Sequence, residues 1–289
     1  MTIKDAPIRR LNVVGCGRVG KTLARLWSQS GALMVQDVLN PSASSAANAV
    51  EFIGAGRAVT DMADLRPADT YLIAAPDALL QPIATQLAER CAAVPHAIAL
   101  HCSGALGADV LAPLRACGWS VASAHPVMSF ADPASAAKQF QGTPCGVEGD
   151  AEAVAEATRA LVHVGAECFG VEPAHKRLYH AAAVYSSNFL PVLQAVAIEL
   201  WEHSGVPPEL TRHLMERLMR NAVDNISAFG PAAALTGPAA RGDSAVVAAQ
   251  TQAIQDWDPL AGEAYGALSA LAMRLAKTGK VGTREDTQC

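Results

Sequence analysis

A glycine-rich stretch, VVGCGRVG at residues 13–20, constrains the fold more than any other feature of the sequence. The strand-like run RRLNVV leads into it, the helical pattern KTLARLWSQSG follows it, and a second strand-like run covers residues 33–39. A strand, a glycine turn, a helix and a second strand form the opening of a parallel α/β sheet that binds a dinucleotide. The stretch therefore predicts a dinucleotide site, and the alternative is a glycine turn that has lost its ligand.

Each glycine of this stretch has an expected role. Gly15 allows the tight turn, Gly17 lets the backbone approach a pyrophosphate, and Gly20 allows the helix to pack closely on the strand. The free N–H groups at the start of the helix face the anion. We expect cofactor contacts from the whole loop, namely Gly15, Cys16, Gly17, Arg18, Val19 and Gly20.

The end of the second strand decides between NAD and NADP. An acidic residue there would accept hydrogen bonds from the ribose 2′-OH and select NAD, and Asp37 is the candidate. If Val38, Leu39 and Asn40 instead extend the strand, its tip presents uncharged groups that can bond a 2′-phosphate, namely Asn40, Ser42, Ser44 and Ser45. This interpretation favours NADP as the cofactor and leaves NAD possible.

Short apolar runs alternate with helical patterns as far as residue 170 and then stop. Repeated β-α units predict a mostly parallel sheet covered on both faces. Four helical patterns follow, at residues 173–204, 207–229, 241–256 and 259–277. The predicted fold is an α/β Rossmann-type domain, residues 1–170, followed by an all-α helical domain, residues 171–289, for substrate binding and dimerisation.

Composition excludes several classes of protein. With 51% hydrophobic and 17% charged residues the chain can bury a large core, and its net charge of -5 with no cluster of Lys and Arg argues against nucleic-acid binding. No signal peptide and no uncharged run of membrane-spanning length are evident, so we expect a cytoplasmic protein with no membrane partner. Seven cysteines without a CxxC pair indicate reduced thiols and no metal site.

Three further strand ends carry small or polar residues. The run YLIAAPDALL ends at Ala74, Ala75 and Pro76, where small side chains would let a nicotinamide ribose lie against the backbone. HCSGALG follows the next strand, with His101 placed to contact substrate, and SAHPVMSF follows the one after it. Because such ends meet at one edge of a parallel sheet, they predict a single site.

His125 is the predicted catalytic residue of this edge. Hydride transfer at a carbinol carbon requires a partner for the hydroxyl proton, and histidine titrates near neutrality. Ser103 could donate a second hydrogen bond to the same oxygen, or only cap the turn before Gly104. The alternative for His125 is a structural histidine, and Cys102 has no evident nucleophilic role.

Six motifs in order carry a family resemblance: VVGCGRVG, HCSGALGADVL, AHPVMSF, GTPCGVEGD, HAAAVYSSNFLPVL and ALTGPAARGD. They resemble the bacterial family that joins a Rossmann-like NADP oxidoreductase domain to a C-terminal domain of unknown function, number 2520. The wider superfamily includes prephenate dehydrogenases, pyrroline-5-carboxylate reductases, ketopantoate reductases and β-hydroxyacid dehydrogenases. The resemblance implies an oxidoreductase and leaves its substrate open. It places His125 and Pro126 on the His-Pro-Met motif that supplies the catalytic histidine of prephenate dehydrogenases, and Ser103 on their assisting serine.

The sequence departs from these patterns at three places. Val184 stands where β-hydroxyacid dehydrogenases carry a catalytic lysine one turn before an asparagine, here Asn188. Leu39 and Asn40 replace a Ser-Arg pair that would clamp a 2′-phosphate, and Gln250 replaces a histidine common in the family. The departures at Val184 and Gln250 motivate a rival hypothesis, a dinucleotide-binding sensor or partner protein without turnover.

The helical half offers substrate-binding candidates. His180 and Asn188 interrupt an apolar helix and could face a cleft, or else bond between helices. Arg241 could bind a substrate carboxylate through its planar guanidinium, or pair with Asp243. Long apolar helices predict a homodimer, which the resemblance also implies.

These observations predict an NAD(P)-dependent oxidoreductase that transfers a hydride between nicotinamide and a small, carboxylate-bearing carbonyl, hydroxyl or imine compound. His125 exchanges the proton, assisted by Ser103 and Asn188. His101, His180 and Arg241 contact the substrate. A prephenate or arogenate dehydrogenase is the third hypothesis, based on the HPVM motif.

Overall fold

The computed structural model describes residues 8–90, 94 and 96–283, and the chain divides into two compact units, Met1–Asn188 and Phe189–Cys289. Two of the seven cysteines, Cys91 and Cys289, lie outside the described residues. The five described cysteines are free thiols.

The first unit is built on one eight-stranded sheet with the strand order β3-β2-β1-β4-β5-β6-β7-β8. The strands from β1 to β6 run parallel, whereas β7 is antiparallel to β6 and parallel to β8. The strand order reverses between β1 and β4, which is where ligands bind in open α/β sheets. The strands are β1 Arg10–Val14, β2 Met34–Leu39, β3 Arg57–Val59, β4 Thr70–Ile73, β5 Ile98–His101, β6 Ser120–Pro126, β7 Pro144–Gly149 and β8 Glu167–Gly170.

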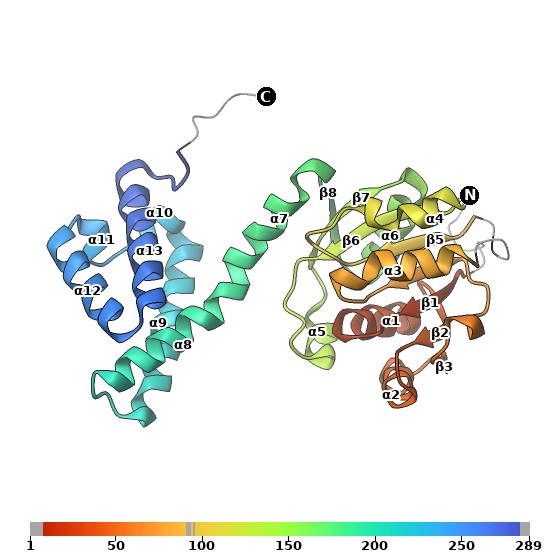
Figure 1. Cartoon of the computed structure of the whole chain (residues 1–289), viewed down its shortest axis with the longest axis horizontal. Coiled ribbons are helices and arrows are strands. Elements are labelled where there is room, and N and C mark those ends of the chain that lie inside the picture. The colour runs from red at the N-terminus through yellow and green to blue at the C-terminus, as the bar shows by residue number, and fades with distance from the viewer. Residues whose placement is uncertain (1–7, 91–93, 95, 284–289) are drawn as a thin grey trace. The chain divides into compact units, whose positions relative to one another are not determined.

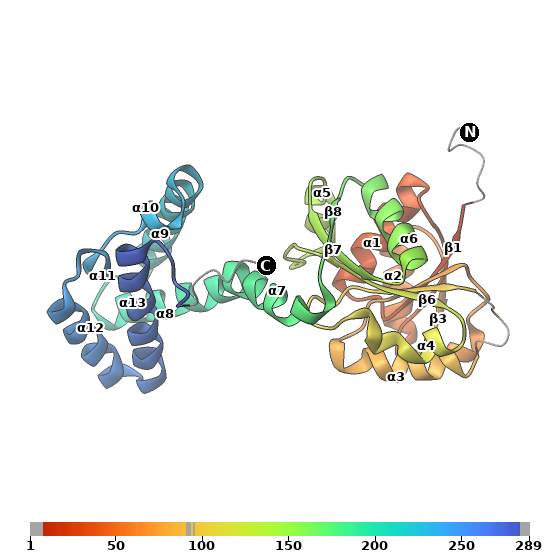
Figure 2. The ribbon, with the colours of Figure 1, turned by 90° about the horizontal axis from the view of Figure 1, so that it is seen from above.

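Helices cover both faces of this sheet (Figures 1 and 2). One core contains apolar side chains of α1, α2 and α6, and the second contains those of α3 and α4. Central strands are apolar on both sides because each side packs on helices. The helices of this unit are α1 Arg18–Ser30, α2 Ala43–Ile53, α3 Asp77–Ala88, α4 Ala112–Ala116, α5 Pro133–Gln139, α6 Ala151–His163 and α7 Lys176–Ala183.

The predicted fold class is confirmed, and five of the strands were recognised from their apolar runs. Three strands, β3, β7 and β8, were not predicted from the sequence. β3 has three residues, and the outer strand β8 has no fully buried residue, so neither carries an apolar run. β7, PCGVEG, contains two glycines and a glutamate, and its polarity concealed a strand whose four central residues are buried.

The second unit is helical and contains α8 Phe189–His203, α9 Pro208–Phe229, α10 Pro231–Ala234, α11 Pro238–Arg241, α12 Ser244–Trp257 and α13 Pro259–Thr278. Of these helices, α9, α12 and α13 lie close to predicted ranges, whereas the range predicted as one helix at 173–204 covers α7, a π-helical turn and α8. The last strand ends at Gly170, where the domain boundary was predicted, but the first compact unit continues to Asn188. The difference arises because α7 packs its polar side chains on the sheet of the first unit.

Residues 173–203 form an uninterrupted helical segment in which Val184–Asn188 adopts a π-helical turn. By length and composition alone this segment could cross a bilayer, since an 18-residue window has a mean hydropathy of 1.4 and none of it is buried. No such span was expected from the sequence. A helix that packs on other helices in a soluble protein has the same composition.

Candidate functional site

The glycine loop joins β1 to α1 and is held from both sides. Gly15 donates its N–H to the carbonyl of Leu39, at 2.9 Å, and adopts a φ of +76° that side chains rarely tolerate. A Cβ on Gly15 would lie 2.9 Å from the Cβ of Ala75, and one on Gly20 would lie 3.0 Å from that of Ala74. The loop and the end of β4 therefore pack too closely for larger residues.

Gly17 differs from its two neighbours because a Cβ there would meet nothing within 4 Å. It stands at the start of α1 with a backbone φ of -79° and faces open space. A cavity of about 550 Å³ lies beside it, lined by the glycine loop, the end of β2 and the end of β4. Free N–H groups at a helix start, a bare Cα and a cavity of this size fit the pyrophosphate of a dinucleotide.

Asn40 lies at the end of β2 but is already engaged by the protein. Its Oδ1 accepts the N–H of Cys16 at 2.6 Å, and its Nδ2 donates to the carbonyl of Ser45 at 3.0 Å. Asn40 therefore orients the glycine loop at the wall of this cavity, and its amide is not free to bond a 2′-phosphate as expected. Ser42 caps α2 and is exposed, so its hydroxyl and that of Ser44 remain accessible.

Asp37 lies inside β2, before the strand end, and is fully buried. Arg57 and Arg66 both bond its carboxylate, with closest distances of 2.9 and 2.7 Å. These hydrogen bonds outweigh burial and hold the pKa of Asp37 below its usual value. The two arginines thus balance the charge of the ionised carboxylate within the sheet, and the carboxylate does not face a ribose.

A second cavity, of about 300 Å³, adjoins the first through Ala74 and Ala75, which line both. The carboxyl ends of β4, β5 and β6 and the helix α7 contribute its walls. Its polar lining consists of Asp77, Cys102, Ser103, His125 and His180.

His125 is half-buried in this second cavity. Its Nδ1 lies 2.9 Å from the hydroxyl of Tyr179, and no described residue bonds its Nε2. Burial, then the neighbouring His180, then the charge of Lys176 lower the pKa of His125 to about 4. At neutral pH the side chain is therefore a neutral imidazole with one nitrogen fixed by a tyrosine and the other available.

His180 packs edge-on against His125, with ring centroids 5.4 Å apart. Its Nδ1 is buried and has no hydrogen-bond partner among the described residues. A Cβ on Gly104 would collide with this nitrogen and with the ring of His125, so the glycine is needed where the two histidines approach the backbone. An unpaired buried nitrogen next to a cavity is a group that a ligand could satisfy.

Lys176 was not singled out from the sequence, because a lysine at a helix start usually extends into solvent. Here its side chain is buried, donates to the hydroxyl of Ser123 at 2.5 Å and lies 3.3 Å from Oε1 of Glu148. Burial lowers the pKa of Lys176, and the charge of Glu148 partly opposes that shift. Its four-residue spacing from His180, on one helix face, is the only sequence signal that could have drawn attention to it.

His101 was predicted to contact substrate, and the structure contradicts this role. The side chain is fully buried, with Nδ1 accepting the N–H of Ser103 at 3.2 Å and Nε2 lying 3.1 Å from the carbonyl of Gly107. Burial lowers its pKa to about 3. Because both ring nitrogens bond the loop that follows β5, none remains for a ligand.

Ser103 and Cys102 also lie at this strand end. The hydroxyl oxygen of Ser103 accepts the N–H groups of Ala105 and Leu106, so it caps the turn, while the residue still lines the second cavity. Burial raises the pKa of the Cys102 thiol to about 12, which leaves no reactive thiolate.

Asn188 and Arg241 are the two remaining predicted residues. Asn188 is exposed and accepts a hydrogen bond from Ser187 at 2.8 Å. Arg241 belongs to the second unit and pairs with Asp243 at 3.0 Å, the alternative that its sequence also suggested. Their substrate roles stay predictions. Among the described residues, no group of three His, Cys, Asp or Glu side chains could hold a metal ion.

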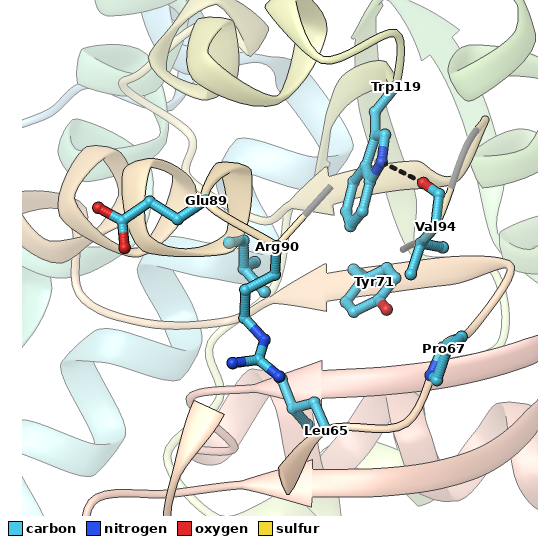
Figure 3. A pocket seen from close by; sticks show the side chains of 8 residues that line it. Leu65, Pro67, Tyr71, Glu89, Arg90, Val94 and Trp119 are labelled. Atoms are coloured by element: carbon cyan, nitrogen blue, oxygen red, sulfur yellow. Dashed lines mark hydrogen bonds between the residues drawn. The ribbon is translucent and has the colours of Figure 1, made fainter. Parts of the chain in front are cut away.

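Another cavity, of about 410 Å³, opens at the opposite, amino-terminal edge of the strands (Figure 3). Tyr71 and Trp119 stack there with ring centroids 4.6 Å apart, and Trp119 donates to the carbonyl of Val94 at 2.8 Å. Arg90 and Glu89 stand at its rim (Figure 3). It contains none of the residues described above.

Two family models match the chain and together cover most of it. Residues 2–126 match the Rossmann-like domain, and residues 143–272 match a domain of unknown function, DUF2520. The chain joins a Rossmann-like domain to a DUF2520 domain. The DUF2520 match begins just before β7, so this domain includes strands and helix α7 of the first compact unit as well as the helical unit. No protein with a curated description matches the sequence.

Solved structures share this arrangement over nearly their full length. Protein TM1727 from Thermotoga maritima is 25% identical, with a TM-score of 0.71 over 93% of this chain and 99% of that one. A protein named putative NADP oxidoreductase from Bacteroides fragilis is 22% identical, with a TM-score of 0.73 over 92% and 98%. A 1-pyrroline-5-carboxylate reductase from Streptococcus pyogenes is 10% identical, with a TM-score of 0.59 over 93% and 99%. The Rossmann-DUF2520 chain thus has a fold that oxidoreductases use.

Proposed function

We propose that the protein is an NADP-dependent oxidoreductase that transfers a hydride between nicotinamide and a small carbonyl, hydroxyl or imine compound. The observation that carries this proposal is the junction of two cavities at Ala74 and Ala75. One lies against the glycine loop and the other contains His125. A dinucleotide whose pyrophosphate rests on Gly17 would extend along these small residues toward the histidine, as in other sheets of this topology.

The preference for NADP rests on the end of β2. Asp37, the one acidic candidate for a ribose 2′-OH, is buried between two arginines. The exposed hydroxyls of Ser42 and Ser44 at the start of α2 offer donors without a negative charge. A 2′-phosphate would meet no repulsion there, whereas the ribose of NAD would lose its usual acidic partner.

The protein's own contribution to the chemistry is proton transfer by His125. A bound nicotinamide would accept or supply the hydride. When a hydroxyl compound is oxidised, its carbon loses the hydride and its oxygen loses a proton, which Nε2 of neutral His125 accepts; reduction reverses both transfers. Tyr179 fixes the other ring nitrogen and so orients the ring. Arg241 as the partner of a substrate carboxylate is a prediction from the sequence.

Calorimetric titration with NADPH and NADH tests the cofactor assignment. Gly17→Ala is the sharpest variant, since its φ and the open space allow a Cβ without strain, but the methyl group would block close approach of a pyrophosphate. We expect tight NADPH binding that falls by about tenfold or more in Gly17→Ala. Gly170→Ala, also with open space, is the control and should bind as the wild type does.

Failure of the wild type to bind either dinucleotide would refute the proposal. Tight NADPH binding without oxidation or reduction of any compound in a carbonyl, hydroxyl and imine panel would favour a sensor or partner protein. Reduction of NAD(P) with prephenate or arogenate as the substrate would instead support the third hypothesis.

We also propose that the helical unit pairs with a second copy of the chain. Val247 is the one buried apolar side chain among its described residues, whereas large apolar side chains of α8 and α9 are exposed, including Phe189, Leu193, Leu218, Ile226 and Phe229. So much uncovered apolar surface is unusual for a monomer. Light scattering at micromolar concentration should give twice the chain mass; a monomer, or a protein that sediments with membranes, would contradict the pairing.

A further inference from the structure

Lys176 is a buried charge that the proposed proton transfer does not use. The side chain is 1% exposed, and its ammonium lies between Ser123 on β6 and Glu148 on β7. These two residues are direct partners across the β6–β7 pair, so their side chains lie next to each other and together can bind one cation. Burying an ammonium is costly unless it is paired and hydrogen-bonded, which indicates that the contact is specific.

The same helix face carries the two residues that touch His125. Tyr179 and His180 follow Lys176 by three and four positions and therefore lie on its side of α7. On β6, Ser123 precedes His125 by two positions, so both side chains point to the same face of the strand. The ammonium thus joins the beginning of α7 to the strand that holds the histidine.

The loop after β5 is hydrogen-bonded to the same two residues, Ser123 and Glu148. Ser123 donates its hydroxyl hydrogen to the carbonyl of Ser103, at 3.1 Å, and Oε1 of Glu148 accepts the N–H of Ala108, at 2.7 Å. The two ends of the Ser103–Ala108 loop are therefore fixed by the two residues that bind Lys176. This loop supplies one wall of the cavity around His125.

We propose that Lys176 is a positioning residue for His125: bound to Ser123 and Glu148, it fixes α7 and the Ser103–Ala108 loop around the imidazole and places a positive charge behind it. The proposal rests on the proposed function, in which His125 transfers the proton. The other ionisable groups around His125 are Asp77 from α3, Cys102 after β5, Cys145 on β7, and Tyr179 and His180 on α7.

The double variant Lys176→Met with Glu148→Gln tests the charge and the anchor together. The lysine change alone would leave a buried carboxylate unpaired, whereas the double variant is neutral and keeps an acceptor for the N–H of Ala108. NMR of protein carrying ¹³C-labelled histidine, with His125→Gln used to assign the signal, gives the titration of His125 directly. We expect its midpoint to rise by roughly half a pH unit or more, while NADPH affinity stays within about threefold.

Two further variants keep the test decisive. Ser123→Ala retains both charges and removes one anchor, so it should move the His125 midpoint in the same direction by less. Arg159→Met with Glu156→Gln removes a different ion pair, on α6, and should leave it unchanged. An unaltered midpoint in the folded double variant and in Ser123→Ala would overturn the proposal. The readout requires neither cofactor nor substrate, so absence of NADPH binding would refute the proposed function without deciding the role of Lys176.

Discussion

The ends of β5 and β6 both carry a histidine, but His101 is enclosed by the protein whereas His125 is open to a cavity. His101 is fully buried and has both ring nitrogens bonded to the loop that follows it. His125 is half-buried, has one nitrogen on Tyr179 and lines a cavity. After β5 the chain turns back, so that the carbonyl of Gly107 lies against the ring of His101, whereas the residue after β6, Val127, donates its N–H to the carbonyl of Pro144 on β7. The path of the next few residues, more than the residue type, decides whether a histidine at a strand end can meet a ligand.

The largest effect is expected from removing His125, the histidine that lines the cavity. His125→Ala should lower turnover of an accepted substrate by roughly 10²- to 10⁴-fold, because proton transfer by a placed side chain is worth that much. NADPH affinity should remain within about twofold, since the glycine loop is untouched. Steady-state kinetics and calorimetry measure the two quantities. A loss of less than about tenfold in turnover would remove His125 from the mechanism.

Removing His101, the enclosed histidine, should lower the free energy of unfolding instead. His101→Leu deletes the acceptor for the N–H of Ser103 and the partner of the Gly107 carbonyl, and leaves both groups buried. Each unsatisfied buried group costs about 1–3 kcal/mol, so urea unfolding should show a loss of roughly 2–6 kcal/mol. If His101→Leu kept wild-type stability but lost substrate affinity, the contrast between the two histidines would be reversed.

The pH dependence of stability should separate the two sites further. Burial lowers the pKa of His101 to about 3, far below that of an unfolded histidine. Between these values the unfolded chain binds a proton that the folded chain does not, so the stabilisation is complete above about pH 6.5 and declines as the pH falls. Between pH 6.5 and pH 4.5 the decline from this one group is roughly 2–3 kcal/mol.

His101→Gln is the matched variant for that measurement, since it does not titrate. Its unfolding free energy should fall less steeply than that of the wild type over the same pH range. If the unfolding free energies of the two proteins fell equally steeply with pH, His101 would not be a buried neutral histidine. The enclosed state of the β5 end would then be refuted.

Sequence patterns could predict the fold because it follows from local signals. A few neighbouring residues are enough to recognise the glycine loop, the apolar runs of the central strands and the periodic helices. The site was harder to predict. His125 was found through a motif, but Asn40 and His101 were assigned to ligands because no sequence shows that Cys16 and Gly107 already occupy their polar atoms. Lys176 was missed because its partners lie 28 and 53 positions earlier, on two other strands.

The smallest effect tests what holds the open histidine in place. Tyr179→Phe removes the hydroxyl bonded to Nδ1 of His125, a loss of roughly 1 kcal/mol from one net hydrogen bond. Without it the ring no longer has one favoured tautomer, so turnover should fall by about fivefold to tenfold, and urea unfolding should show a loss of no more than about 1 kcal/mol. His163→Gln, at a histidine that bonds a carbonyl on the exposed surface, is the control and should leave turnover unchanged. Wild-type turnover in Tyr179→Phe would mean that the ring is oriented by packing against His180, and the two strand ends would then differ in exposure alone.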